Sequence, residues 1–329
     1  MAEPVAATEH DLMADTLRRL AEGFDGEALS KALDDFGFAE LLAEAPRGAV
    51  SALFDALGRA GSMSAAIQDV LLLPLAAVLP DGTDGHCVVL PTIGATVVGA
   101  GDEKAVTLRG LLLGQRPGRA LLAPVAMSGG TVWVQIKDPG RLSTRVVSGL
   151  DPALGMTEVT ADGIAATVVA DGQQARTLGD AVVTAGRLAL GYQIVGAVGK
   201  MIDLAITHAR DRVQFGRPIG SFQGVRNRLA DAYVAREAAV SALDMAWEAD
   251  DPYLAGMLAK SLAGRSARIA ATHCQQVLAG IGFTAEHPFH RYLARALVLD
   301  SVLGSAIELR RAIGAYAIST GNIPRLVEL

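Results

Sequence analysis

The polar stretch from Arg212 to Gly224 constrains the fold most, because it separates two long apolar segments in the C-terminal half of the chain. It reads Arg-Val-Gln-Phe-Gly-Arg-Pro-Ile and then Gly-Ser-Phe-Gln-Gly. Gly216 suits the left-handed end of a helix and Pro218 cannot continue one, so we expect a second helix to begin near Gln223. Guanidinium groups beside an aromatic ring suit a diphosphate and a flat heterocycle. The stretch therefore predicts a helix–turn–helix junction that can bind a ligand.

Hydrophobic periodicity divides the chain into three regions, with boundaries expected at 1–82, 83–175 and 176–329. The first is a helical unit, with helices expected over 9–23, 27–45, 48–60 and 64–79. The last is an up-and-down four-helix bundle. Its helices are expected over 186–212 (with helix resuming from about 177), 223–250, 253–276 and 289–318.

Short Val/Leu/Thr runs between Gly, Pro and Asp turns fill the middle region, which indicates β structure. The expected strands are 87–90, 95–98, 105–108, 120–124 and 131–136. Their spacing predicts an antiparallel sandwich or barrel rather than an alternation of strands and helices. The run 131–136 alternates apolar and polar residues, so one of its faces should be solvated.

Charge and cysteine content exclude several functions. A net charge of −6 and a pI near 5.5 argue against nucleic-acid binding. Cys87 and Cys274 stand too far apart in sequence for a metal-ligand spacing, so no metal site is expected. Residues 1–4 lack the basic start of a signal peptide, and the most apolar run, 70–79, is too short to span a bilayer. We expect a cytoplasmic protein with no membrane span.

Two motifs resemble the acyl-CoA dehydrogenase family. The first is Arg-x-x-Phe-Gly-x-Pro-Ile-x-x-Phe-Gln, which begins at Arg212. The second covers 275–292 and is similar to the family's Gln-x-x-Gly-Gly-x-Gly-(Phe/Tyr)-x-x-Glu-x-Pro segment. The resemblance covers 180–329, is partial over the first 80 residues and fades between them. The His-Pro-Phe-His-Arg-Tyr variant in the second motif looks most like actinobacterial members that act on CoA thioesters of steroid side chains.

The resemblance implies a mostly α protein with a central β domain: an N-terminal helical domain, a middle β domain and a four-helix bundle. It also implies FAD as the cofactor. In the family the two motifs bind the adenine and pyrophosphate end of a flavin whose ring lies in the neighbouring subunit. The matching residues here are Arg212, Phe215, Gln276 and Gly280, with Ala279 in place of one glycine.

The family's catalytic glutamate removes the α proton of the thioester while the flavin accepts a hydride. Its two recognised positions correspond here to Gly186 and Gly304, and glycine cannot transfer a proton. Glu308 stands at the position of the family's glutamine and is the weak substitute candidate. The usual flavin-ring loop and Gly-x-Lys-x-Trp-Ile-Thr strand do not occur between 80 and 175.

Simpler roles exist for each of these residues. Arg212 can face the helix dipole, Gln276 can cap a helix, and Phe215 can belong to a core. Glu308 can be a solvated carboxylate paired with Arg310 or Arg311. Because Arg212 is followed by Phe-Gly-x-Pro-Ile, we favour the cofactor role for it.

The resemblance therefore predicts a subunit without a catalytic base, in an α2β2 complex with a full-length acyl-CoA dehydrogenase. That partner would bind most of the acyl-CoA substrate and pass electrons to an acceptor. Two alternatives remain: a pseudoenzyme homodimer that serves as a scaffold, and a self-sufficient dehydrogenase that uses Glu308. The glycines at 191, 196 and 199 and the apolar terminal helix also lead us to expect an oligomer.

Overall fold

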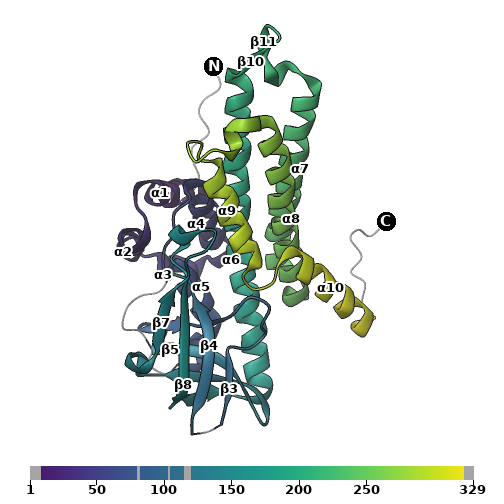
Figure 1. The fold of residues 1–329 in the computed structure, drawn as a ribbon. Helices are drawn as coiled ribbons and strands as arrows, with labels where there is room; N and C mark the ends of the chain where they lie inside the picture. Colours follow the sequence, from purple (N-terminus) through teal and green to yellow (C-terminus); the bar gives the residue numbers. More distant parts are fainter. Residues whose placement is uncertain (1–8, 80–81, 103, 115–119, 322–329) are drawn as a thin grey trace.

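The computed structural model describes residues 9–79, 82–102, 104–114 and 120–321. The opening residues 1–4, on which the expected absence of a signal peptide depends, lie outside this description. Within it, α6 (Gly172–Asp211) runs from the sheet at one end of the molecule to a hairpin formed by β10 (Val213–Gln214) and β11 (Arg217–Pro218) at the other. The N-terminal helices lie on one side of α6, and the bundle helices α7 (Gln223–Met245) and α8 (Pro252–Leu278) lie on the other (Figure 1).

The N-terminal unit contains five α-helices and a final 3-10 turn among its described residues. They are α1 (Glu9–Gly23), α2 (Gly26–Phe36), α3 (Phe38–Glu44), α4 (Pro46–Ala60), α5 (Ala66–Leu72) and η1 (Leu73–Val78). The single helix expected over 27–45 is wrong. It breaks at Gly37, whose φ of 82° ends α2 in the left-handed region that favours glycine.

The middle of the chain folds into one nine-stranded sheet with a central path β7-β8-β4-β3-β5-β6-β9. Its strands are β1 (His86–Val88), β2 (Leu90–Pro91), β3 (Gly99–Gly101), β4 (Val106–Leu112), β5 (Ala120–Met127), β6 (Gly130–Ile136), β7 (Ser143–Val146), β8 (Thr157–Ile164) and β9 (Thr167–Ala170). The expected strand 95–98 is wrong, because the chain bends over 96–98 and β3 begins at Gly99, although Val98 already shares backbone hydrogen bonds with Pro124 and Arg109.

The sheet is mixed, so the expectation of purely antiparallel strands needs correction. β5 pairs in parallel with both β1 and β3, whereas its partner β6 runs antiparallel. The solvated face expected for 131–136 is also wrong. Trp133 packs into the helical core and donates a hydrogen bond from Nε1 to the carbonyl oxygen of Ala175 (3.2 Å), while Val132 and Val134 pack into the core on the sheet's other face.

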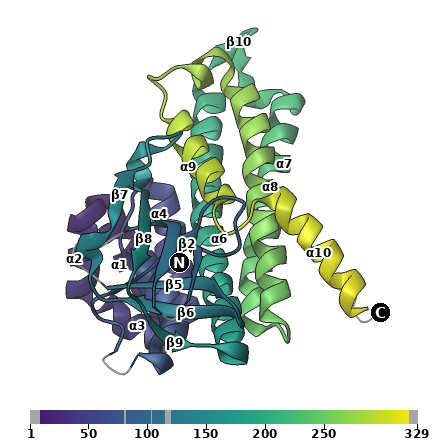
Figure 2. The ribbon, with the colours of Figure 1, turned by 60° about the horizontal axis from the view of Figure 1, so that its bottom comes forward.

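The bundle confirms three of the four long helices and divides the fourth. α6 begins at Gly172, well before the long helix expected from Gly186 and also before 177, where helix was expected to resume, and it is followed by the hairpin β10 (Val213–Gln214) and β11 (Arg217–Pro218). Then come α7 (Gln223–Met245), α8 (Pro252–Leu278), α9 (Phe289–Ser301) and α10 (Ala306–Thr320). The chain breaks after α9 because Leu303 and Gly304 have φ values of 57° and 100°. α10 therefore points away from the bundle (Figures 1 and 2).

Two glycines let α4 and α6 cross with their backbones in contact. A Cβ at Gly58 would lie 2.1 Å from the carbonyl oxygen of Gln193, and one at Gly196 would lie 2.2 Å from that of Asp55. These contacts are made within one chain, so the α6 glycines give no support to the expected oligomer. By length and composition α6 could cross a bilayer, but 83% of its most apolar 18-residue window is buried inside the fold.

Candidate functional site

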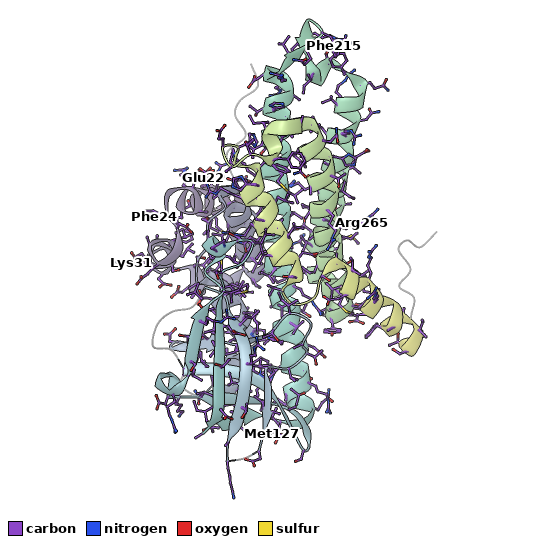
Figure 3. The ribbon with its side chains drawn as sticks, in the orientation of Figure 1. Glu22, Phe24, Lys31, Met127, Phe215 and Arg265 are labelled. Atoms are coloured by element: carbon purple, nitrogen blue, oxygen red, sulfur yellow. The ribbon has the colours of Figure 1, made fainter. Side chains whose placement is uncertain are left out.

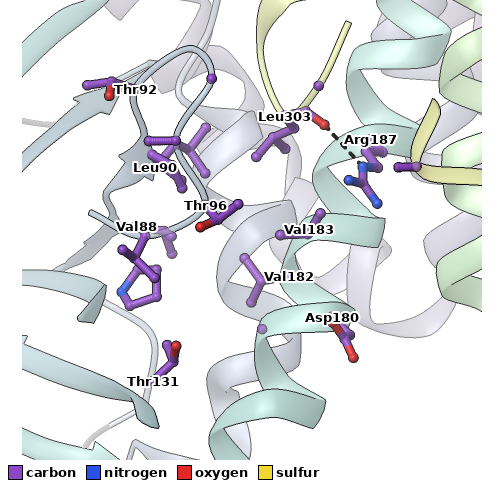
Figure 4. A pocket seen from close by; sticks show the side chains of 18 of the residues that line it. Val88, Leu90, Thr92, Thr96, Thr131, Asp180, Val182, Val183, Arg187 and Leu303 are labelled. Carbon is purple, nitrogen blue, oxygen red and sulfur yellow. Dashed lines mark hydrogen bonds between the residues drawn. The ribbon is translucent and has the colours of Figure 1, made fainter. Parts of the chain in front are cut away.

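A cavity of about 630 Å³ lies between the sheet, the first half of α6 and the α9–α10 junction (Figure 4). One wall is formed by β1, β2 and the loop that runs on to Val97. The opposite wall is the face of α6 from Ala175 to Arg187, and the beginning of α8 adds Tyr253. The lining is mostly aliphatic, so the cavity can enclose an apolar group.

The two expected base positions lie close together at one wall of this cavity, which Gly304 lines. A Cβ at Gly186 would lie 2.5 Å from Cδ1 of Leu303, the residue that precedes Gly304. The side chain of Leu303 therefore occupies the space that a glutamate at 186 would need. The structure brings the two positions close together, and aliphatic side chains fill the space next to each: Leu303 beside Gly186 and Leu309 beside Gly304.

Two buried cations hold the α9–α10 junction in place. Nζ of Lys260 donates to the carbonyl oxygens of Asp300 (3.0 Å), Val302 (3.2 Å) and Gly304 (3.3 Å). Nε of Arg187 donates to the carbonyl oxygen of Leu303 (3.1 Å). These bonds satisfy carbonyls that the end of α9 leaves without helical partners. The wall of the cavity is thus fixed by side chains from α6 and α8.

Glu308 lines the same cavity, but its carboxylate is engaged at the start of α10. It accepts hydrogen bonds from the backbone nitrogen (2.9 Å) and Oγ (2.8 Å) of Ser305, which completes a capping box. The bonds from Ser305 hold the pKa of Glu308 below its ordinary value. A general base near neutral pH needs a raised pKa, so the geometry favours a capping role for Glu308.

Substitution of Glu308 distinguishes the cap from a base. Glutamine preserves the capping box, so Glu308→Gln should change the free energy of unfolding by less than about 0.5 kcal/mol, whereas Glu308→Ala should lower it by about 1 kcal/mol. Turnover of any active complex should stay within about tenfold for Glu308→Gln, because loss of a positioned base costs ~10²–10⁴. Urea unfolding and steady-state rates measure the two effects. A larger fall in rate at unchanged flavin content would make Glu308 the base.

Asp180 and Arg187 are site residues that the sequence motifs missed. They lie seven residues apart on the same face of α6, beside the cavity (Figure 4). Burial raises the pKa of Asp180 above its ordinary value, and the positive charge of Arg187 opposes that rise. One signal was available, since Arg187 is the single charged residue between Asp180 and Lys200 on an otherwise apolar helix.

The hairpin residues lie in the solvent at the far end of the bundle. Arg212 follows the last residue of α6, and its exposed guanidinium has no hydrogen-bond partner in the described parts of the chain. Phe215 is 92% exposed and has a φ of 52°, which is unusual for a side chain of its size. Its ring meets the edge of Phe222 at 6.2 Å. The core role considered for Phe215 is therefore wrong within this chain.

The second motif lies at the end of α8. Gln276 is exposed on the last turn, and a Cβ at Gly280 would meet nothing within 4 Å. Packing within the chain therefore does not require glycine at 280. Ala279 has a φ of 51° and a ψ of −136°, a conformation that glycine adopts far more readily. Among the described residues no hydrogen bond joins this segment to Arg212 or Phe215.

The hairpin lies far from the cavity. From Arg187 to Arg212, α6 advances by roughly 25 residues, or about 37 Å. Phe215 stands at one end of the molecule, and Met127 of the sheet stands at the other (Figure 3). This separation exceeds the length of an extended dinucleotide, so one such molecule cannot span both places in this chain.

Sequence comparison with known proteins matches the C-terminal bundle of this chain. Residues 180–318 match the family described as "Acyl-CoA dehydrogenase, C-terminal domain". Acyl-CoA dehydrogenase IpdE2 of Mycolicibacterium smegmatis is 33% identical over 141 residues, which make up 42% of this chain and 45% of that protein. The matched part thus spans less than half the length of this relative.

Similar solved structures extend the likeness in fold to nearly the whole chain. A chain of the ChsE4-ChsE5 complex from Mycobacterium tuberculosis aligns with a TM-score of 0.77 at 22% identity, over 98% of this chain and 100% of that one. A chain of the Tcur3481-Tcur3483 steroid ACAD G363A variant aligns with a TM-score of 0.77 at 20% identity, over 95% and 100%. At these identities the alignments establish the fold.

Proposed function

We propose that the chain is the subunit without a catalytic base in a flavin-dependent acyl-CoA dehydrogenase, a proposal supported by the match of residues 180–318 to that family's C-terminal domain. A full-length family member would be its partner in an α2β2 complex. That partner would supply the glutamate, bind most of the acyl-CoA and deliver electrons to an acceptor. The expected location is the cytoplasm.

The observation that carries this proposal is the distance between the hairpin and the cavity. Arg212 and Phe215 match the adenine and pyrophosphate motif, yet they lie about 37 Å along α6 from the cavity of their own chain. A flavin held at the hairpin must therefore place its ring in another chain. The glycines at 186 and 304 support the same division of roles, because neither position offers a base in this chain.

The residues present fit one end of FAD. The exposed guanidinium of Arg212 suits a pyrophosphate, the exposed ring of Phe215 offers a stacking face, and the open space above Gly280 allows an adenine to approach. Gln276 adds an amide within the same motif. Bound FAD supplies the hydride acceptor for the β carbon of the acyl chain. The residues of this chain would hold the far end of the cofactor and leave proton removal to the partner.

Exposed apolar side chains support a partner surface over the bundle. Besides Phe215, several large apolar residues are exposed on or beside α7, the hairpin and the end of α8: Val213, Tyr233, Val234, Met245, Ile281 and Phe283. Apolar surface of this kind marks protein interfaces. Two of the similar structures are the ChsE4-ChsE5 complex and the Tcur3481-Tcur3483 steroid ACAD variant. Bulky CoA thioesters of the steroid type are accordingly the proposed substrates.

A second candidate is a scaffold without catalytic activity, a homodimer of this fold. The aliphatic side chains that fill the space beside the two glycines, Leu303 beside Gly186 and Leu309 beside Gly304, favour it. The two functions differ in one measurement, the absorbance spectrum of the purified protein, alone and co-expressed with a full-length family member. The dehydrogenase subunit should show flavin bands only after co-expression. No flavin under either condition would favour the scaffold, and flavin with activity in the isolated chain would contradict both.

A further inference from the structure

Arg187 is a buried cation that forms no ion pair with a carboxylate in the described part of the chain, although the negative charge of Asp180 on the same helix face acts on it. Its side chain is 7% exposed, and Nη1 has no hydrogen-bond partner. Its other contacts are the carbonyl oxygen of Leu303 and the ring of Tyr253, whose centroid lies 5.1 Å from Cζ. Neither contact carries a full negative charge. Among the described residues no carboxylate forms an ion pair with Arg187.

Burying the guanidinium of Arg187 costs free energy unless an anionic group pairs with it. Burial lowers the pKa of Arg187, but a guanidinium remains charged at neutral pH. A buried charge without a partner loses hydration that no other group restores, and for that reason buried arginines in proteins are nearly always paired. Asp180, on the same face of α6, is exposed and forms no bond with Arg187. The unsatisfied nitrogen therefore indicates an anionic group that comes from outside the chain.

The position of Arg187 in the cavity identifies the kind of molecule. Arg187 lines the cavity of about 630 Å³, together with aliphatic side chains such as Leu90, Val182 and Val183 (Figure 4). A site of this composition encloses an apolar body and orients it through a few polar groups. A carboxylate is the anion that a guanidinium binds with the best geometry.

We propose that this cavity binds an apolar carboxylic acid in its ionised form, with a carboxylate oxygen accepting a hydrogen bond from Nη1 of Arg187. The aliphatic part of the acid lies against the α6 face around Val183. The site performs no dehydrogenation, because no base faces it at 186 or 304. It is distinct from the proposed flavin contacts and does not depend on them, since the hairpin lies at the other end of α6.

Three probes of equal chain length test the site on the full-length chain by titration calorimetry: decanoate, decan-1-ol and decanoyl-CoA. Decanoate should bind about ten to a hundred times more tightly than decan-1-ol, the range expected for one charge-assisted contact to a buried group. Arg187→Gln should remove this preference, so that decanoate and decan-1-ol bind to the variant with similar affinity. Val183→Phe, which narrows the cavity from a half-buried position, should weaken the binding of both.

Several results would overturn the proposal. One is equal affinity of the unmodified chain for decanoate and decan-1-ol, and another is a preference for decanoate that survives Arg187→Gln. Binding that Val183→Phe leaves unchanged would place the acid elsewhere on the protein. Decanoyl-CoA that binds more tightly than decanoate, with no loss in Arg187→Gln, would assign the cavity to a thioester. If Arg187→Gln does not fold, the proposal is still tested by comparing decanoate with decan-1-ol on the unmodified chain and on Val183→Phe.

Discussion

Replacing Arg212 with alanine should raise the Kd of the complex for FAD by about ten- to a hundredfold while leaving the turnover of flavin-loaded sites nearly unchanged. The guanidinium lies exposed at the end of α6, so its loss removes no contact within the described chain. A charge-assisted contact to a pyrophosphate is worth roughly 1.5–3 kcal/mol, and that range corresponds to one to two decades in Kd. In the proposed complex this contact is made at the pyrophosphate and not at the flavin ring, where the electrons are transferred, so turnover of loaded sites should not depend on it.

Titration of FAD into the apo complex measures this effect, with Arg210→Ala as the matched control. Arg210 is exposed on the last turn of the same helix but lies outside the motif, so its removal should change the Kd by less than about threefold. Substitution of the partner's glutamate should have the opposite result, with FAD retained and turnover lost. An unchanged affinity in Arg212→Ala would reduce Arg212 to a helix-end arginine that faces the dipole.

The largest expected loss of stability comes from Lys260→Met. Lys260 is fully buried and donates to three carbonyl oxygens at the end of α9 and in the junction that follows. Methionine matches its volume but donates nothing, so the three carbonyls lose their partner. Breaking a buried network of this kind costs about 3–5 kcal/mol. The variant should also loosen the wall of the cavity at Leu303.

The pH dependence of this loss has a defined sign. Burial lowers the pKa of Lys260 from 10.5 to about 8. The positive charge of Arg187 lowers this pKa further, whereas the negative charges of Asp300 and Glu308 raise it. Between these values the unfolded chain binds more protons than the folded one, so the contribution of Lys260 to stability rises with pH. The destabilisation of Lys260→Met should therefore be larger at pH 9.5 than at pH 7, by about 2 kcal/mol.

Urea unfolding at the two pH values measures both effects. Lys200→Met serves as the control, because Lys200 is a half-buried lysine of α6 with no hydrogen-bond partner among the described residues. The free energy of unfolding of Lys200→Met should differ from that of the unmodified chain by less than about 1 kcal/mol at either pH. A destabilisation of Lys260→Met that stays constant between pH 7 and pH 9.5 would mean that Lys260 keeps its ordinary pKa in the fold.

The sequence predicted the helices because apolar residues with helical spacing determine them locally. α1 was predicted at its observed bounds, and α8 was predicted within two residues at each end. The breaks were missed because they depend on backbone conformation. Glycine at 37 takes a positive φ, and the α9–α10 junction bends at Leu303, where a leucine gives no signal of a left-handed residue. The parallel pairing of β5 was missed for a different reason, since it joins strands that are not neighbours in sequence.

The functional residues also include some that the local sequence predicts and others that only the fold reveals. The hairpin motif could be predicted from the sequence because its residues are contiguous. The structure places it in the solvent, where a partner can reach it. The cavity could not be predicted because its lining comes from the sheet, α6, α8 and the α9–α10 junction, which meet only in the fold. In the sequence, Arg187 stands out only as the single charged residue between Asp180 and Lys200, and its unpaired nitrogen becomes evident only once Leu303 and Tyr253 are in place.

Counting the flavin in a purified complex of this chain with a full-length partner tests the shared site most directly. Native mass spectrometry gives the number of each chain and of bound FAD molecules in one measurement. The proposed function predicts one FAD for each pair of unlike chains, and none on this chain alone. One FAD for every chain, or FAD retained by this chain without a partner, would contradict it.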